Sequence, residues 1–186
     1  MNNSDILRQL FTSEVNRIEQ SITYAVEIID SNFLYIPHDF FKKYNVRRLS
    51  LVHVSLISLS DTDTAFEGLE KSLNFLHMQD GILFRDLEWY QLRNLSELKD
   101  LSLINIGLEY IDNDISFISN LNLTEISLLK NKISFISDRA FAPFVNLQAL
   151  SLGHNMISEL KRSMLPNPGK HLKKFDLRFE KDYGQL

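Results

Sequence analysis

The chain has 186 residues, of which 44% are hydrophobic and 24% charged, an ordinary composition for one globular domain. The formal net charge of −4 argues against nucleic-acid binding, for which a strongly basic domain is expected. No apolar run reaches the roughly 18 residues of a membrane helix, and residues 1–20 carry charges throughout, so neither a membrane span nor a signal-peptide core is expected.

The first predicted element is an amphipathic helix near the amino terminus. Apolar residues recur at helical spacing between residues 5 and 22, and Ser4 and Asp5 are suitable as N-cap residues. We therefore expect residues 1–22 to form a helical cap or linker in front of the elements that follow.

From residue 23 onward an apolar pattern recurs at intervals of 23 to 27 residues, with repeats beginning at positions 23, 46, 73, 98, 123, 147 and 172. The fifth and sixth repeats are the clearest. Leu123, Ile126, Leu128, Asn131, Ile133 and Ile136 return as Leu147, Leu150, Leu152, Asn155, Ile157 and Leu160. This L-x-x-L-x-L-x-x-N-x-L-x-x-L spacing is that of a leucine-rich repeat. Its alternation predicts one short strand per repeat, and the repeats must stack because one coil cannot cover its own apolar face.

The ninth place of each repeat is the place of an asparagine whose side chain can satisfy turn backbone groups of adjacent coils. Asn131 and Asn155 fit this role. Other residues stand there in the remaining repeats, namely Ser31, Val54, Gly81, Ile106 and Glu180. A fully regular asparagine ladder is therefore not expected.

Large aromatic residues follow the repeat pattern on the return side of two coils. Phe141 and Phe144 follow the fifth repeat, and Phe40, Phe41 and Tyr44 follow the first. We expect these rings to pack inside the stack, where edge-to-face contacts add about 0.5–1.5 kcal/mol per pair.

Two columns of outward side chains are expected on the concave face of the strands, which repeat proteins use to hold partners. The fifth place holds mainly small hydroxyls: Glu27, Ser50, His77, Ser102, Ser127, Ser151 and Asp176. The third place is more varied: Ala25, Arg48, Phe75, Asp100, Glu125, Ala149 and Lys174. An outward aromatic is a candidate anchor, although a register error would return Phe75 to the core. The predicted partner-binding residues are Arg48, Phe75, His77, Asp100, Glu125 and Lys174.

Other site chemistries find little support in the sequence. His53 and Asp80 are expected side by side, with His77 nearby. Side chains on a gently curved face point away from one another, however, and no short zinc-binding signature occurs in the sequence. No metal or other cofactor is therefore expected. No nucleophile elbow, phosphate loop or dinucleotide fingerprint is present. The carboxylate pairs Asp61/Asp63 and Asp112/Asp114 are interpreted as solvated loop charges. N-glycosylation sequons lie at Asn2 and, on the predicted return side, at Asn94 and Asn122.

The twin repeats with Phe141 and Phe144 between them resemble the typical class of arthropod leucine-rich repeat proteins. The run from Ile157 to Pro166, followed by Leu172 and the Phe-Asp-Leu strand at 175–177, is similar to the branch that includes the non-catalytic leucine-rich subunit of a shrimp luciferase. The resemblance covers about residues 23–186 and implies a secreted, non-catalytic protein. The absence of cysteine and of a leader departs from that pattern.

The predicted fold is an α/β solenoid: a right-handed horseshoe over residues 23–186, with about seven short parallel strands on the concave side and an irregular or short-helical convex side. Nothing after Leu177 would cover the last coil, so the repeat domain is expected to be truncated at its carboxyl end. The predicted function is a non-enzymatic protein-binding or scaffolding module. The alternatives are a non-catalytic subunit of a secreted luciferase-like oxidoreductase and an intracellular regulatory scaffold. The location is extracellular if the chain is a fragment, and otherwise cytoplasmic.

Overall fold

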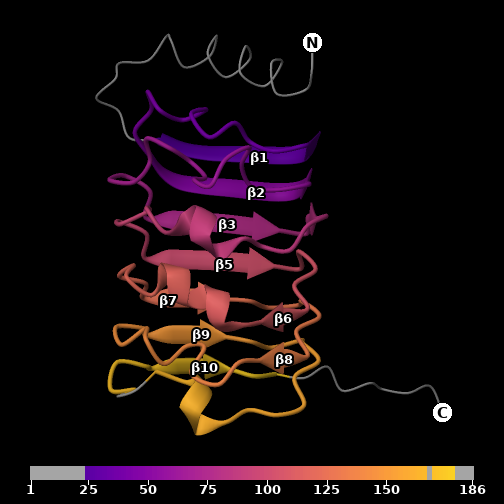
Figure 1. The fold of residues 1–186 in the computed structure, drawn as a ribbon, viewed down its shortest axis with the longest axis vertical. Coiled ribbons are helices and arrows are strands. Elements are labelled where there is room, and N and C mark those ends of the chain that lie inside the picture. Colours follow the sequence, from indigo (N-terminus) through magenta and orange to yellow (C-terminus); the bar gives the residue numbers. More distant parts are fainter. Residues whose placement is uncertain (1–23, 167–168, 179–186) are drawn as a thin grey trace, which may run out of the picture.

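The computed structural model describes residues 24–166 and 169–178, which form an elongated stack of coils (Figure 1). Successive coils each add a strand to one parallel sheet in the order β1-β2-β3-β5-β7-β9-β10. These strands are Tyr24–Phe33, Val46–Leu56, Phe75–Gln79, Asp100–Ile104, Glu125–Ser127, Ala149–Ser151 and Lys174–Asp176. The seven-stranded solenoid expected from the repeat is confirmed. The predicted helix at residues 1–22, the carboxyl-terminal end and Glu180 lie outside the described residues.

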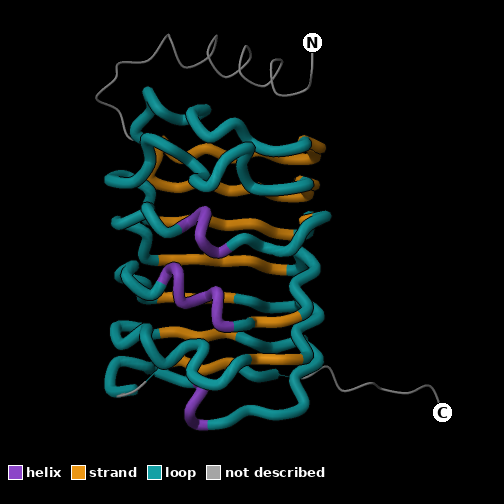
Figure 2. The backbone as a smooth tube through the Cα atoms, viewed as in Figure 1, coloured by secondary structure: helices purple, strands orange, loops and turns teal. Residues whose placement is uncertain are grey.

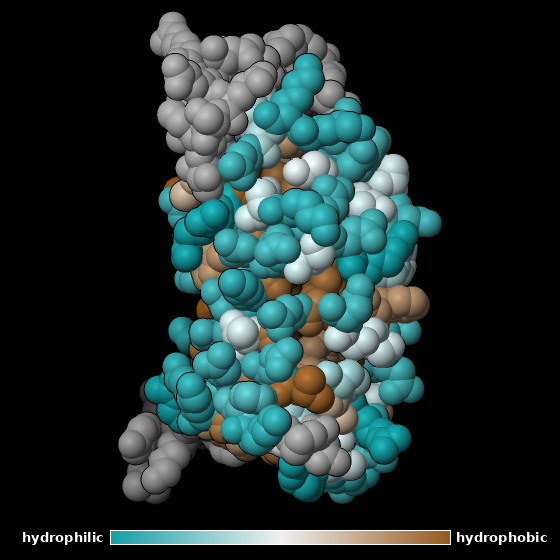
Figure 3. Space-filling model, turned by 90° about the vertical axis from the view of Figure 1, so that its left-hand side faces the viewer, coloured by the Kyte–Doolittle hydropathy of each residue, from teal (hydrophilic) through white to brown (hydrophobic). Residues whose placement is uncertain are grey.

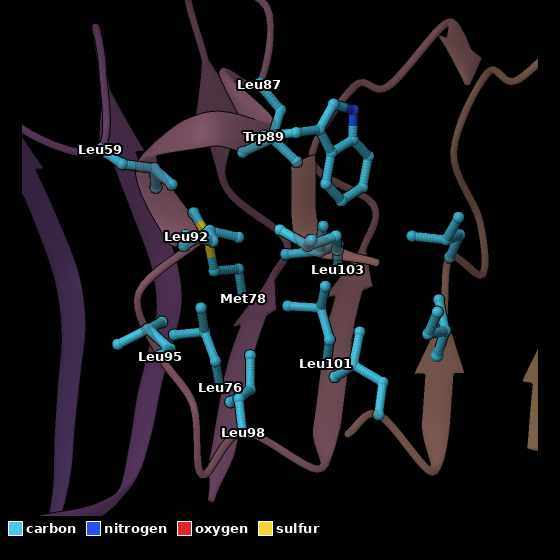
Figure 4. Close-up of a cluster of buried hydrophobic side chains, with 14 of the residues drawn as sticks. Leu59, Leu76, Met78, Leu87, Trp89, Leu92, Leu95, Leu98, Leu101 and Leu103 are labelled. Atoms are coloured by element: carbon cyan, nitrogen blue, oxygen red, sulfur yellow. The ribbon is translucent and has the colours of Figure 1, made fainter. Parts of the chain in front are cut away.

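Alternation along each strand builds the core, because every second side chain of a strand points to the same side. Leu76 and Met78 from β3 and Leu101 and Leu103 from β5 are buried, and they face side chains from the return side of the coil, such as Trp89 (Figure 4). Burying a side chain of this kind contributes about 1.5–3 kcal/mol relative to leaving it exposed. The core therefore runs along the whole stack, one layer per coil.

The first two strands are longer than the short strands predicted, with 10 residues in β1 and 11 in β2. In these coils Ser31 and Val54 occupy the asparagine place, and they pair with each other so that the ladder continues to Phe33 and Leu56. The short β4 (Ile82–Leu83) then pairs with the end of β2. Without an asparagine side chain to hold the turn, the backbone groups are satisfied by a longer strand.

The return side of the coils is irregular, as predicted. It holds the 3₁₀ turns η1 (Trp89–Leu92), η2 (Asn113–Ile118) and η3 (Arg162–Met164), which are drawn in purple in Figure 2, and a two-stranded sheet of β6 (Tyr110–Ile111) and β8 (Phe135–Ile136). The helical part of the predicted α/β class is limited to these turns in the described part of the chain. None of the described helices is long and apolar enough to cross a bilayer.

The aromatic residues of the return side pack in the interior, as expected. Phe141 and Phe144 are buried with ring centroids 6.5 Å apart, and Phe40 and Phe41 meet edge-on at 4.8 Å. Phe66 of the next coil lies 6.2 Å from Phe41, so this contact joins two coils.

Asparagine side chains tie adjacent coils together where the repeat has them. The Asn131 Oδ1 accepts hydrogen bonds from the backbone N–H groups of Ile106 (3.0 Å) and Leu108 (3.2 Å), and its Nδ2 donates to the Leu103 carbonyl (2.7 Å). Where glycine replaces asparagine at position 81, a Cβ would lie 2.2 Å from the Val54 carbonyl oxygen, so the close approach of two coils requires glycine. The predicted role of the ninth place is confirmed.

The flank where the return segments lead into the strands faces the viewer in Figure 3. It is mostly hydrophilic, with hydrophobic residues visible between the coils. The polar surface of this flank includes exposed loop residues that directly precede a strand, such as Lys99 and Lys173.

Candidate partner-binding face

The strand register places the predicted outward columns on one surface. We call this surface the concave face, meaning the side of the main sheet turned away from the core. Arg48 pairs with Phe75, Phe75 with Asp100, Asp100 with Glu125, and the column continues through Ala149 to Lys174. The fifth-place column from Glu27 to Asp176 is aligned in the same way. The alignment of the strands that the repeat spacing predicted is therefore correct in each of these coils.

The amino-terminal half of the concave face carries a cluster of three stacked side chains. The Arg48 guanidinium lies 3.9 Å from the centroid of the Phe75 ring, and the His77 ring stacks on Phe75 with centroids 5.8 Å apart. A cation over an aromatic face at an exposed site contributes about 0.5–1 kcal/mol. Phe75 is half-buried beneath these neighbours and belongs to the concave face, so the alternative that a register error returns it to the core is excluded.

The His77 ring is held in place at both nitrogens. Its Nδ1 lies 3.0 Å from the Ser102 Oγ, and its Nε2 lies 3.2 Å from the Gln79 Oε1. Because both contacts come from β3 and β5, the orientation of the ring is fixed by the sheet. The cluster is thus preorganised before any partner arrives.

The third-place column has acidic residues in its middle and a basic residue toward each end. Asp100 and Glu125 are direct register partners, and like charges directly opposite each other destabilise a sheet slightly. The Thr124 Oγ1 donates to the Asp100 carboxylate at 3.3 Å, whereas Glu125 and Lys174 are exposed. The middle of the face is therefore acidic and its two ends, at Arg48 and Lys174, are basic.

A polar ladder runs along the edge of the concave face at the eighth place of the first four coils. The His53 Nδ1 lies 3.0 Å from Asp30, its Nε2 lies 3.9 Å from Asp80, and the Asn105 Nδ2 donates to Asp80 at 2.8 Å. The hydrogen bonds from Asn105 and Gln79, with His53 nearby, lower the pKa of the Asp80 carboxyl. From the sequence we predicted that His53 and Asp80 are neighbours, but not their contacts with Asp30 and Asn105.

The ladder has a backbone signature. Asp30, His53, Asp80 and Asn105 all have φ between 49° and 54°. Asp, Asn and His are the non-glycine residues that tolerate this left-handed region best, so their recurrence at one place in the repeat is the signal that could have revealed the ladder. His77 is not part of it, and the described residues bring together no group of three or more potential metal ligands.

The two candidate glycosylation sites lie in loops between strands. Asn94 and Asn122 are both exposed, and the Asn122 Oδ1 accepts a hydrogen bond of 2.9 Å from the Asn146 Nδ2. Their accessibility is compatible with modification, which stays a prediction.

Comparison with known proteins supports the repeat assignment. A family model described as "Leucine rich repeat" matches residues 112–157, the segment that contains both Asn131 and Asn155. A comparison with curated proteins gave no match. The arthropod class and the similarity to a luciferase subunit stay predictions. The matched segment, the parallel ladder and the asparagine hydrogen bonds between coils together support a leucine-rich repeat solenoid.

Proposed function

We propose that the chain is a non-enzymatic scaffold that binds a protein partner through its concave face. Leucine-rich repeat domains generally bind proteins and are typically non-catalytic. The observation that carries the proposal is the preorganised Arg48–Phe75–His77 cluster, which lies in register with the Asp100–Glu125 pair on a continuous sheet.

The cluster supplies an anchor for the partner. An apolar side chain of the partner would complete the burial of Phe75, and the Arg48 guanidinium would lose water while keeping its contact with the ring. Aromatic and arginine residues at the centre of an interface commonly account for 2 kcal/mol or more each. Because the sheet already orients both groups, little side-chain entropy is lost on binding.

The charge order sets the orientation of the partner. Five strand spacings of about 4.8 Å separate Arg48 from Lys174, so the charged column is about 24 Å long. A partner with basic groups opposite Asp100 and Glu125 and acidic groups at its two ends would match this order. Such complementarity mainly affects the association rate and the orientation of the complex.

The test is capture of the partner with two variants and two matched controls. Phe75→Ala and Arg48→Glu should each reduce capture at least tenfold and leave the circular dichroism melt unchanged. Phe135→Ala and Arg139→Glu change exposed residues of the same types outside the concave face and should have no effect on capture. Equal capture by Phe75→Ala and wild type would refute the proposal.

The captured protein also distinguishes the alternatives that the sequence raised. Co-capture of a catalytic polypeptide identifies a non-catalytic subunit of an enzyme complex, whereas a regulatory partner identifies a scaffold. For the location we propose the extracellular space, and mass spectrometry of Asn94 and Asn122 from the native source tests it, because N-glycans at these sequons require the secretory route.

A further inference from the structure

Two adjoining cavities are lined by residues of the return side of the coils. The 3₁₀ turns η1 and η2, which supply part of the lining, are purple in Figure 2. The volumes of the two cavities are about 290 Å³ and about 580 Å³. Arg85, Glu88 and Tyr90 line both cavities, so the two form one feature, which we call the acidic groove. The groove is separate from the concave face and plays no part in the function proposed above.

Negative charge is concentrated in the acidic groove. Its lining contains seven carboxylates and one guanidinium, a formal charge of −6, and since the whole chain carries −4, the remainder of the chain carries +2. The carboxylates include both pairs interpreted from the sequence as solvated loop charges. Asp61 and Asp63 lie at one end, and Asp112 and Asp114 lie at the other.

These carboxylates are largely uncompensated. Within the described part of the chain, Asp61 is the only one of the seven with a basic side chain within 4 Å, the His38 ring, whose Nδ1 lies 3.2 Å from the carboxylate. The guanidinium of Arg93, near the groove, is engaged with the carbonyl oxygens of Asp63 and Tyr90, each at 2.9 Å. Clustered like charges repel, and a cavity lined by one sign of charge concentrates the opposite sign.

A buried hydrogen-bond acceptor in the groove also has no partner. Gln91 is 3% exposed and lines the larger cavity, and its Oε1 has no hydrogen-bond partner among the described residues. Its Nε2 donates to the Thr62 carbonyl at 2.9 Å and to the Ser58 Oγ at 3.4 Å. If the side-chain amide of Gln91 were rotated by 180°, its oxygen would face the Thr62 carbonyl oxygen, and two acceptors would repel each other. The group without a partner is therefore the Oε1 acceptor. A buried acceptor of this kind calls for a donor.

Aromatic and apolar side chains complete the lining. Tyr90 and Tyr110 donate hydrogen bonds to Glu88 (2.8 Å) and Asp86 (2.5 Å), and these bonds raise the pKa of each phenol, that of Tyr110 to about 12. The exposed Leu34 and Ile57 lie along the larger cavity. Aromatic faces attract cations, and apolar edges suit the methylene stems of long basic side chains.

We propose that the acidic groove binds an arginine-rich segment of a partner protein. Guanidinium groups carry five donors in a planar fork, which suits the carboxylates and the unpaired Gln91 oxygen, and they stack on tyrosine rings. A metal ion fits less well, because the carboxylates are spread over the loops of three coils. Charge complementarity and the unpaired buried acceptor carry the proposal.

The test uses fluorescence anisotropy with a labelled peptide of alternating arginine and serine at low ionic strength. A peptide with citrulline in place of arginine has nearly the same shape without the charge, and it should bind at least tenfold more weakly. Glu109→Gln combined with Asp114→Asn removes two exposed groove charges and should weaken binding of the arginine peptide about tenfold. Tyr110→Leu should weaken it about threefold, and Tyr110→Phe should not.

The matched control is Asp138→Asn combined with Glu159→Gln, which changes the net charge equally at exposed residues outside the groove. This control should alter binding less than twofold. The Gln91 side-chain amide resonance should shift with the arginine peptide and stay fixed with the citrulline peptide. Failure of the arginine peptide to bind the folded protein, equal loss in the control, or a fixed Gln91 resonance during binding would each overturn the proposal.

Discussion

Replacing Asn131 by alanine should destabilise the chain more than any other single change at a ninth place. The side chain is 6% exposed and bridges two coils through its amide. Its loss leaves the backbone N–H groups of Ile106 and Leu108 without an acceptor and the Leu103 carbonyl without this donor. All three groups belong to buried residues, so water cannot easily replace the amide.

The magnitude follows from the cost of burying unpaired groups. Each unsatisfied buried group costs about 1–3 kcal/mol, and allowing for partial relaxation we expect Asn131→Ala to cost about 4 kcal/mol. Asn155→Ala should cost about 2 kcal/mol, because Asn155 is half-buried and accepts from a single N–H, that of Ile133 at 3.0 Å. Because the free energy of unfolding of a whole domain is about 5–15 kcal/mol, Asn131→Ala would remove a large part of the stability of the fold.

Urea unfolding followed by circular dichroism measures both values. With a slope of about 2 kcal/mol per molar, Asn131→Ala should lower the midpoint by about 2 M without changing the slope. Asn146→Ala is the control, because Asn146 is exposed and its side chain donates a hydrogen bond to the Oδ1 of the exposed Asn122, so this change should cost less than about 1 kcal/mol. A loss for Asn131→Ala as small as that of the control would refute the bridging role of the amide.

Three further outcomes follow from the structure. Gly81→Ala places a Cβ 2.2 Å from a carbonyl oxygen of the preceding coil and should lower the unfolding free energy by about 3 kcal/mol in the same urea assay; an unchanged midpoint would contradict the close approach. Asp86→Asn should return the pKa of Tyr110 from about 12 toward 10.0, as read from tyrosinate absorbance; an unaltered titration would show that the carboxylate is not the cause. Hydrogen bonds from Arg178 lower the pKa of Asp176 from 3.8 to about 2, so the pair stabilises the fold above about pH 4 and loses that effect as the pH falls to 2. Carboxyl NMR of an Arg178→Ala variant, which keeps the backbone N–H of residue 178, should show the pKa of Asp176 rising from about 2 toward 3.8, and a value still near 2 would be inconsistent with the side-chain pairing.

The strands and their register could be predicted because two independent periodicities agree. Alternation of apolar residues within each repeat identifies the inward positions, and recurrence near 24 residues aligns the repeats. Together they placed Phe75 beside Arg48 and Asp100, as the register has it. The strands of repeats without the asparagine also have the predicted register, because the apolar positions alone determine which side of the strand faces the core.

The length of the first strands could not be predicted. It depends on how the chain satisfies backbone groups at Ser31 and Val54 when no asparagine is present, and that is decided by pairing between coils. The acidic groove was missed for a related reason. Asp61 and Asp112 are far apart in the sequence and lie in loops of different length, so their convergence on one groove depends on the stacking of the coils.

Disulfide trapping tests the stacked columns most directly, because the chain contains no cysteine of its own. Ser102 and Ser127 are register partners in neighbouring strands, where Cα atoms lie about 5 Å apart, within the range that a disulfide can span. Mild oxidation of a Ser102→Cys/Ser127→Cys variant should therefore give an intramolecular crosslink in high yield. A Ser102→Cys/Ser151→Cys variant, in which one strand intervenes, should remain reduced. Crosslinking of the second pair instead of the first would contradict the parallel stack and, with it, the concave face proposed to bind the partner.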